Sequence, residues 1–344
     1  MRKDRLGLGL LGLALSLVLL LCAGLLPVAA DSGGGGHTVG MVIDPTPKAV
    51  DLGADFSVDI KVTISAGEAV NTAEAHINFD PAYLEVVSIT AGTALPTPLD
   101  SSFDNTAGTI DYAAGATLGG AAPTADFVLA TLNLTAKAVT EAAALTFMFD
   151  APARNTAAFT VVVESPYIED VLDHAAVADG SVQILPLGSL SGHVDLQGRP
   201  TPAEASWITP LTVVFFAPGT DTVVREESVT TDDEGNFTVA DVATGTYDIG
   251  VKCPRSLSEL VAGVAFSAGS ATPVSFGPLR EGDANNDDAI TEADYSVLWF
   301  YYGESSAEAL DSCDFNRDGV VGGLDYSLLW YNYGQAGDMW GMWP

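Results

Sequence analysis

Two acidic stretches near the C-terminal end of the chain repeat with a spacing of 31 residues. The first reads DANNDDAITEAD at residues 283–294, and the second reads DFNRDGVVGGLD at residues 314–325. Each places oxygen-bearing side chains at positions 1, 3, 5 and 12 and an apolar residue at position 8. Ca²⁺ prefers about six to eight oxygen ligands, and a loop of this length can surround it with alternate side chains and one backbone carbonyl. We therefore predict two calcium ions, one in each stretch.

Residues 283–294 are called loop 1 below, and residues 314–325 are called loop 2. The predicted ligands are the side chains of Asp283, Asn285, Asp287 and Asp294 with the carbonyl of Ala289, and the side chains of Asp314, Asn316, Asp318 and Asp325 with the carbonyl of Val320. An acidic surface turn without metal is the alternative for one loop alone. Two loops in register favour calcium.

The two loops differ at position 6, where the chain must turn sharply. Loop 2 has Gly319 at this position, whereas loop 1 has Asp288. Glycine adopts a left-handed backbone freely, and aspartate tolerates it better than most other residues. We therefore expect loop 1 to bind calcium more weakly than loop 2.

A helix is predicted after each loop, and the two helices also repeat. Residues 294–303 read DYSVLWFYYG, and residues 325–334 read DYSLLWYNYG. Three positions of each segment share one helical face, which predicts a small shared core of Tyr295, Leu298 and Tyr302 with Tyr326, Leu329 and Tyr333. Trp299 and Trp330 are expected at the edge of this face, where they could meet a partner.

Residues 281–344 resemble a dockerin, the paired calcium-loop module that attaches secreted proteins to cohesin domains. The paired loops and the shared sequence DYS(V/L)LW carry this resemblance. It implies a cohesin-bearing partner that is recognised by residues at the boundary between each loop and the following helix. Here these residues are Glu292 and Ala293 in the first repeat, and Gly323 and Leu324 in the second. The chain departs from the common dockerin pattern at Asp288 and in its aromatic-rich helices.

Residues 38–186 contain short runs of β-type residues separated by Gly, Pro, Asn and Asp. Most alternate apolar and polar positions at residues 56–62, 73–79, 84–89, 127–134, 145–149 and 159–163. This alternation is typical of a sheet with one buried face, and strands without intervening helices predict an all-β sandwich. A second set of runs, clearest at residues 211–216 and 247–251, predicts a smaller sandwich over residues 187–280.

The sequence NFDPAYLEVVSITAG at residues 78–92 resembles the signature of a cohesin domain. The resemblance implies a jelly-roll β-sandwich that binds dockerins through one exposed sheet face. Alternation turns the apolar residues of 73–79 inward, so Glu74, His76 and Asn78 are candidates for that face. A merely solvated sheet surface is the alternative. The fold is also related to carbohydrate-binding modules, so glycan binding by an adhesive surface protein is the alternative function.

The middle sandwich, residues 187–280, resembles the carboxypeptidase-regulatory and collagen-adhesin B-type repeats, which have an Ig-like or transthyretin-like fold. TDDEGNF at residues 231–237 and GTY at residues 245–247 carry this resemblance. It implies a spacer.

The N-terminal residues 1–30 combine a basic start, an apolar run and small residues before Asp31. This pattern predicts a secretory signal cleaved near Ala30, with an uncleaved membrane anchor as the alternative. A glycine-rich leader follows at residues 31–37. After cleavage two cysteines remain, Cys253 and Cys313. They fall in different predicted domains, which favours two separate thiols over a disulfide.

The chain of 344 residues has a formal net charge of −32. This acidity argues against nucleic acid as a partner, because phosphate binding needs clustered cations. The four histidines lack metal-ligand spacing, and no nucleophile elbow or phosphate loop is present. The sequence therefore predicts a mainly β, secreted, non-catalytic scaffold that pairs with dockerin-bearing proteins at one end and cohesin-bearing proteins at the other, with a possible link to polysaccharide degradation.

Overall fold

The computed structural model describes residues 39–339, apart from 66–67, 151–153, 162–167 and 202. The predicted signal peptide and glycine-rich leader lie outside the described residues. No helix in the described part is long and apolar enough to cross a membrane. The chain divides into two compact units, Met1–Leu185 and Pro186–Pro344.

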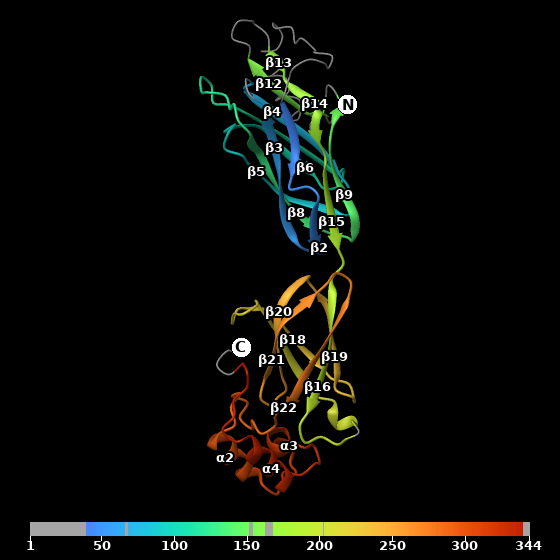
Figure 1. Cartoon of the computed structure of the whole chain (residues 1–344), viewed down its shortest axis with the longest axis vertical. Helices are drawn as coiled ribbons and strands as arrows, with labels where there is room; N and C mark the ends of the chain where they lie inside the picture. The colour runs from blue at the N-terminus through green and yellow to red at the C-terminus, as the bar shows by residue number, and fades with distance from the viewer. Residues whose placement is uncertain (1–38, 66–67, 151–153, 162–167, 202, 340–344) are drawn as a thin grey trace, which may run out of the picture. The chain divides into compact units, whose positions relative to one another are not determined.

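The first unit is a β-sandwich of two sheets (Figure 1). One sheet has the order β14 (Leu172–Ala178), β1 (Val39–Asp44), β3 (Asp55–Ile64), β8 (Phe127–Ala136) and β5 (Leu84–Ala91). The other has the order β13 (Ile168–Asp170), β12 (Ala157–Val161), β4 (Thr72–Phe79), β9 (Thr140–Phe147), β15 (Gly180–Leu185) and β2 (Lys48–Asp51), with β7 (Thr109–Gly115) between β4 and β6 (Thr97–Asp104). A short hairpin of β10 (Phe149–Asp150) and β11 (Arg154–Asn155) follows β9.

The core of this sandwich comes from the inward positions of both sheets. Ile60 and Leu132 project from one sheet, and Ile77 and Leu145 project from the other; all four are fully buried. Along β4 buried and half-buried residues alternate without a break, as the period-2 pattern predicts. The Asp-Pro pair ends β4 as predicted, because the chain turns at Asp80 and β5 begins at Leu84.

The second unit begins with a smaller sandwich. A sheet of β19 (Asn236–Val242), β16 (Gly188–Leu196) and β22 (Ala271–Leu279) packs on a sheet of β18 (Val223–Thr230), β17 (Pro210–Phe216), β20 (Gly245–Lys252) and β21 (Glu259–Phe266). A short 3₁₀ helix, η1 (Ala205–Trp207), joins β16 to β17. Aromatic rings fill the core, with Phe215 contacting Tyr247 and Phe266 on one side and Phe237 stacking on Phe276 on the other.

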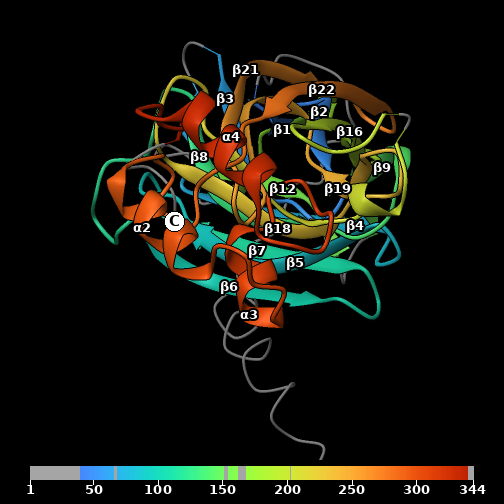
Figure 2. The ribbon, with the colours of Figure 1, turned by 90° about the horizontal axis from the view of Figure 1, so that it is seen from below.

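The unit ends in a helical module of α2 (Glu292–Tyr301), α3 (Ala307–Cys313) and α4 (Gly323–Asn332), which Figure 2 shows from below. Its small core contains Ile290, Leu298, Phe315 and Leu329. Leu257 of the second sandwich completes this core, and Met339 returns to pack on Val214 and Phe216 of that sandwich. The second sandwich and the helical module therefore form one packed unit.

Candidate calcium loops and docking faces

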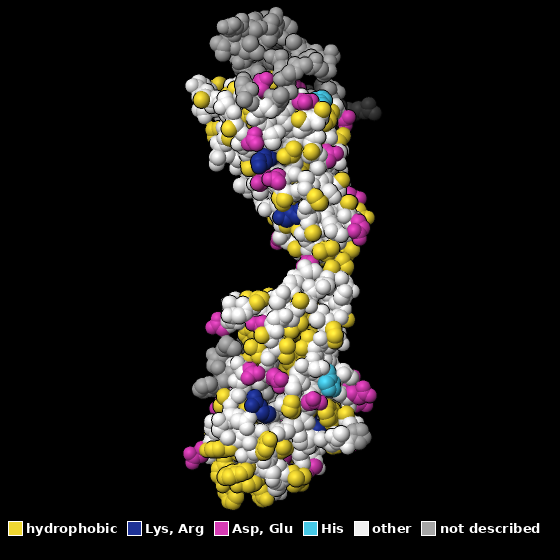
Figure 3. All heavy atoms as spheres, in the orientation of Figure 1, with side chains coloured by type: hydrophobic (Ala, Val, Ile, Leu, Met, Phe, Trp, Pro, Cys, Tyr) yellow, Lys and Arg dark blue, Asp and Glu magenta, His cyan; other side chains and the backbone are white. Residues whose placement is uncertain are grey.

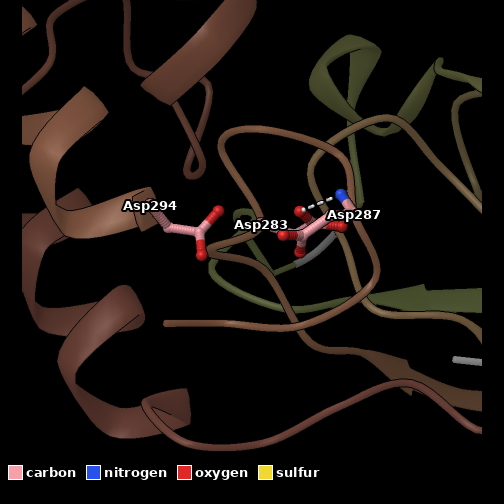
Figure 4. A group of neighbouring side chains, drawn as sticks. All are labelled: Asp283, Asp287 and Asp294. Atoms are coloured by element: carbon pink, nitrogen blue, oxygen red, sulfur yellow. Dashed lines mark hydrogen bonds between the residues drawn. The ribbon is translucent and has the colours of Figure 1, made fainter. Parts of the chain in front are cut away.

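Loop 1 brings three predicted ligands together. One carboxylate oxygen from each of Asp283, Asp287 and Asp294 lies within 4.8 Å of the others (Figure 4). Asp283 and Asp294 are fully buried, whereas Asp287 is exposed. Three carboxylates so close repel one another, and a divalent cation with oxygen ligands would relieve this repulsion. The donor set of loop 1 therefore fits Ca²⁺.

Most internal hydrogen bonds of loop 1 that involve side chains recur in loop 2. In loop 1 the Asp287 N–H donates to Asp283 Oδ1 at 3.0 Å, and in loop 2 the Asp318 N–H donates to Asp314 Oδ1 at 3.1 Å. The same match holds for six further bonds. In loop 1 these run from Asp288 N to Asp283 Oδ2, from Ala289 N to Asp287 Oδ1, from Asn285 N to Asp294 Oδ1, from Thr291 N to Asp294 Oδ2, from Asn285 Nδ2 to Asp287 Oδ2 and from Asp287 N to Asn285 Oδ1. Each has its counterpart 31 residues later. Both loops thus have the same folded form.

The last ligand position of each loop also caps the following helix. Asp294 accepts a hydrogen bond from the Thr291 N–H at 2.7 Å, and Asp325 accepts one from the Gly322 N–H at 2.8 Å. Burial raises the pKa of both carboxyl groups above the ordinary value for aspartate. A bound cation would favour their charged form, so calcium binding and helix capping support each other.

Position 6 has a left-handed backbone in both loops, as the sequence predicts. Gly319 has a φ of 91°, and Asp288 adopts 66° in its place. The Asp288 side chain also makes a contact of its own, because its Oδ1 accepts a hydrogen bond from the Ser258 N–H at 2.7 Å. The expected difference in calcium affinity between the loops stays a prediction.

The expected aromatic core of the helical module is wrong. Leu298 and Leu329 are buried, but Tyr295 and Tyr326 are 37% exposed and the other two predicted core tyrosines are more exposed. Each helix places its leucine in the buried core, and the tyrosines lie on the outer surface. Figure 3 shows the hydrophobic side chains gathered over this module.

The outer tyrosines form stacks with the two tryptophans. Tyr295 stacks on Trp299 and Trp299 on Tyr302, with ring centroids 6.3 and 6.2 Å apart. Tyr326 stacks on Trp330 in the second repeat at 6.3 Å. The four residues expected to read a partner, Glu292, Ala293, Gly323 and Leu324, are all exposed. The stacked rings and these four residues are called the aromatic face below.

In the first unit, Glu74, His76 and Asn78 occupy the outward positions of β4, as predicted, but they are only half exposed. His76 Nδ1 lies 2.6 Å from Asp111 Oδ1, and Arg154 Nε donates to the same oxygen at 2.8 Å. Arg154 also bonds the Asn78 side chain. The sequence pattern did not reveal Asp111 or Arg154, although Arg154 is the one arginine of residues 38–186.

The two cysteines are free and buried, as expected for separate thiols. Burial raises the pKa of Cys253 to about 11 and that of Cys313 to about 12. Such thiols are unreactive near neutral pH because the thiolate is the nucleophile. Both cysteines therefore serve as packing residues.

Comparisons with known proteins match two parts of the chain. A family model for the cohesin domain matches residues 42–153, and one for the dockerin type I domain matches residues 281–330. Three similar solved structures are cohesins. The third ScaC cohesin of Acetivibrio cellulolyticus, solved with the ScaB dockerin, is 18% identical, with coverage of 43% of this chain and 99% of that one and a TM-score of 0.36.

The seventh ScaB type I cohesin of Pseudobacteroides cellulosolvens is 16% identical, with coverage of 42% and 91% and a TM-score of 0.35. A non-cellulosomal cohesin of the archaeon Archaeoglobus fulgidus is 15% identical, with coverage of 43% and 91% and a TM-score of 0.33. No curated protein matches the chain. Type I dockerin domains bind calcium in paired loops. The chain therefore carries an N-terminal cohesin domain and a C-terminal type I dockerin domain, two non-catalytic modules of protein–protein assembly.

Proposed function

We propose that this chain is a secreted adaptor whose cohesin domain receives a dockerin of another protein while its own dockerin domain binds a cohesin elsewhere. The observation that carries the proposal is the duplication of loop 1 and loop 2, with matching hydrogen bonds and a matching exposed aromatic stack after each loop. The apolar segment of residues 1–30 supports export.

We assign calcium to both loops through the ten predicted ligands, of which Ala289 and Val320 contribute carbonyls by their position. Calcium supplies the charge that holds the carboxylates of each loop together, and the residues of the loop orient those carboxylates through their backbone N–H groups. The ordered loops in turn fix the starts of α2 and α4, and with them the aromatic face.

On the cohesin side, we assign the outer surface of β4, β7 and β6 to dockerin binding. Glu74, His76 and Asn78 lie on this surface together with Asp111 and Arg154. All residues of β6 are exposed, including Leu99, which is 41% exposed. A surface with both apolar and hydrogen-bonded polar groups suits a specific protein partner. We extend the proposal to extracellular assemblies that degrade polysaccharides.

Calorimetry with CaCl₂ tests the metal assignment. The chain is expected to take up two calcium ions, and Asp287→Ala and Asp318→Ala are each expected to remove one of them, because each variant deletes the position-5 ligand of one loop. Asp233→Asn, in an exposed acidic turn of the second sandwich, serves as the control and should retain both sites. Capture of cohesin domains in calcium but not in EGTA supports the adaptor, whereas glycan binding without such capture contradicts it.

Self-assembly through the chain's own two modules is expected to be weak at low salt. Residues 38–186 carry four basic and 19 acidic residues, and residues 281–344 carry one basic and 13 acidic residues. Like charges on both modules disfavour their association, and salt screens that repulsion. Sedimentation velocity with calcium at low and at physiological salt measures the effect. Tight oligomers at low salt would contradict this expectation.

A further inference from the structure

Basic residues concentrate where the second sandwich packs on the dockerin domain. Residues 31–344 contain ten Lys and Arg residues, and five of them contact this junction: Arg199, Lys252, Arg255, Arg280 and Arg317. Four of the five come from the sandwich, residues 187–280, whereas the dockerin domain is strongly acidic. At the junction, basic residues of the sandwich therefore face the acidic dockerin domain. The contacts that the junction makes with loop 1 differ from those it makes with loop 2.

Lys252, at the end of β20, reaches from the sandwich into loop 1. Its side chain is 1% exposed, and its Nζ donates to Asp283 Oδ2 and to Asn286 Oδ1, both at 2.8 Å. A third bond to the Ser256 carbonyl at 2.6 Å holds the ammonium in place. Asp283 is the first predicted ligand of loop 1, so a fixed positive charge already lies against a carboxylate that loop 1 would offer to calcium.

Asp288 fastens the opposite part of loop 1 to the same sandwich. It is 1% exposed, and its two oxygens accept hydrogen bonds from the Ser258 N–H at 2.7 Å and the Ser258 hydroxyl at 2.6 Å. Its carbonyl accepts a bond from the Gly337 N–H at 2.9 Å. The residue that departs from the usual glycine of position 6 is thus a bridge between loop 1 and the sandwich.

Loop 2 has no such support among the described residues. Gly319 replaces Asp288 and is exposed, and no ion pair is formed by Asp314, the counterpart of Asp283, within the described part of the chain. Arg317 in loop 2 is near two like charges, Arg199 and Arg255, and near two opposite charges, Glu281 and Asp314. Among the described residues it forms no ion pair with a ligand of loop 2. Loop 2 therefore has no buried ion pair, in the described part of the chain, that matches the pair of Lys252 with Asp283 in loop 1.

We propose that Lys252 and Asp288 are positioning residues that keep loop 1 folded without calcium, so that calcium controls the folding of loop 2 alone. Lys252 supplies part of the positive charge that the carboxylates of loop 1 would otherwise obtain from the ion, and Asp288 fixes the turn. Loop 2 depends on calcium because, among the described residues, no buried ion pair holds its carboxylates as Lys252 holds Asp283. The inference rests on the proposed calcium sites.

Hydrogen exchange of the full chain, resolved by peptide mass spectrometry, compares the matched backbone amides of the two loops. Three pairs of backbone N–H groups make the same hydrogen bonds in the two loops, namely Asp287 and Asp318, Asp288 and Gly319, and Ala289 and Val320. Each loop is therefore the internal standard for the other. In calcium both sets should be protected. In EGTA we expect exchange in loop 2 to rise about tenfold or more and exchange in loop 1 to change by less than about threefold.

Lys252→Met is expected to make loop 1 as calcium-dependent as loop 2. The variant should remain protected at both loops in calcium and lose protection at both in EGTA. A residue needed only for packing would lose protection under both conditions. Lys61→Met, which removes a half-buried lysine 3.7 Å from Asp44 in the cohesin domain, is the matched control and should leave both loops unchanged. The comparison of the two loops in the unmodified chain stands even where the variant does not fold.

The outcomes separate this inference from the proposed function. Calcium uptake with equal loss of protection at both loops in EGTA, or with no loss at either, overturns the inference and leaves the calcium sites standing. If loop 1 of the Lys252→Met variant stays protected from exchange in EGTA, the proposed role of the lysine is wrong. Absence of any calcium uptake overturns the calcium assignment, and the inference with it.

Discussion

Arg199→Met is expected to destabilise the second unit by about 3–5 kcal/mol. Arg199 Nη2 lies 3.0 Å from Glu281 Oε1, and both side chains are completely buried at the junction between the second sandwich and the dockerin domain. Removal of the guanidinium leaves the Glu281 carboxylate without its partner in a site where burial already raises its pKa. The unit must then either bury an unpaired charge or protonate it, and both cost stability.

Urea unfolding in saturating calcium, followed by circular dichroism, measures this loss. Arg225→Met is the matched control, because its pair with Glu227 is 31% and 40% exposed and should contribute less than about 1 kcal/mol. Adding Glu281→Met to the Arg199→Met variant removes the unpaired charge and should recover much of the lost stability. A loss no larger than that of the control, or no recovery in the double variant, would show that the pair is unimportant.

The sequence predicted the strands that have one buried face and one more exposed face. In β4, Ala73, Ala75, Ile77 and Phe79 are buried and their neighbours are half exposed, so alternation was visible in the residues themselves. The sequence did not predict β6, because every residue of this strand is exposed and the pattern TPLDSSFD carries no alternation. Its pairing with β7 holds it in the sheet, and such a partner cannot be read from the strand alone.

The dockerin domain shows the same contrast between local and distant information. Its calcium ligands could be predicted from the sequence, whereas the burial of its helix faces could not. The ligands of each loop lie within twelve residues, so their spacing alone predicts the site. The burial of helix faces depends on distant residues. Leu257, which belongs to the sandwich, joins the core against Leu298 and Leu329, and this contact leaves the tyrosines outside. The sequence of each helix offers two apolar faces and does not show which one a distant segment will cover.

Part of the chain's acidity is balanced by basic residues that are distant in sequence. The dockerin domain is acidic almost throughout, and the sandwich places Arg199, Lys252 and Arg255 against it. Because these residues precede the domain by at least 26 positions, the composition of residues 281–344 gave no sign of them. The middle sandwich, which the sequence suggested was a spacer, contributes directly to the environment of loop 1.

The double variant Trp299→Ala with Trp330→Ala is expected to lose most of the affinity of the dockerin domain for a cohesin. Trp299 is 66% exposed and Trp330 is 68% exposed, so the protein uses neither ring to fill its core. Large exposed aromatic patches mark binding surfaces, and tryptophan is the residue most enriched among those that dominate interface energies. We expect a loss of about 2–4 kcal/mol, or about 30-fold to 1000-fold in Kd.

Surface plasmon resonance in calcium, against the cohesin domain that the unmodified chain captures, measures this loss. The two single variants show which helix carries the contact, because each tryptophan reports on one repeat. Leu118→Ala, a fully exposed residue of the cohesin domain, is the control and should bind as the unmodified chain does. Thermal unfolding of the double variant and of the two single variants should be unchanged, since the removed rings are outside the core. Binding within about threefold of the unmodified chain by the double variant would place the cohesin contact elsewhere on the dockerin domain.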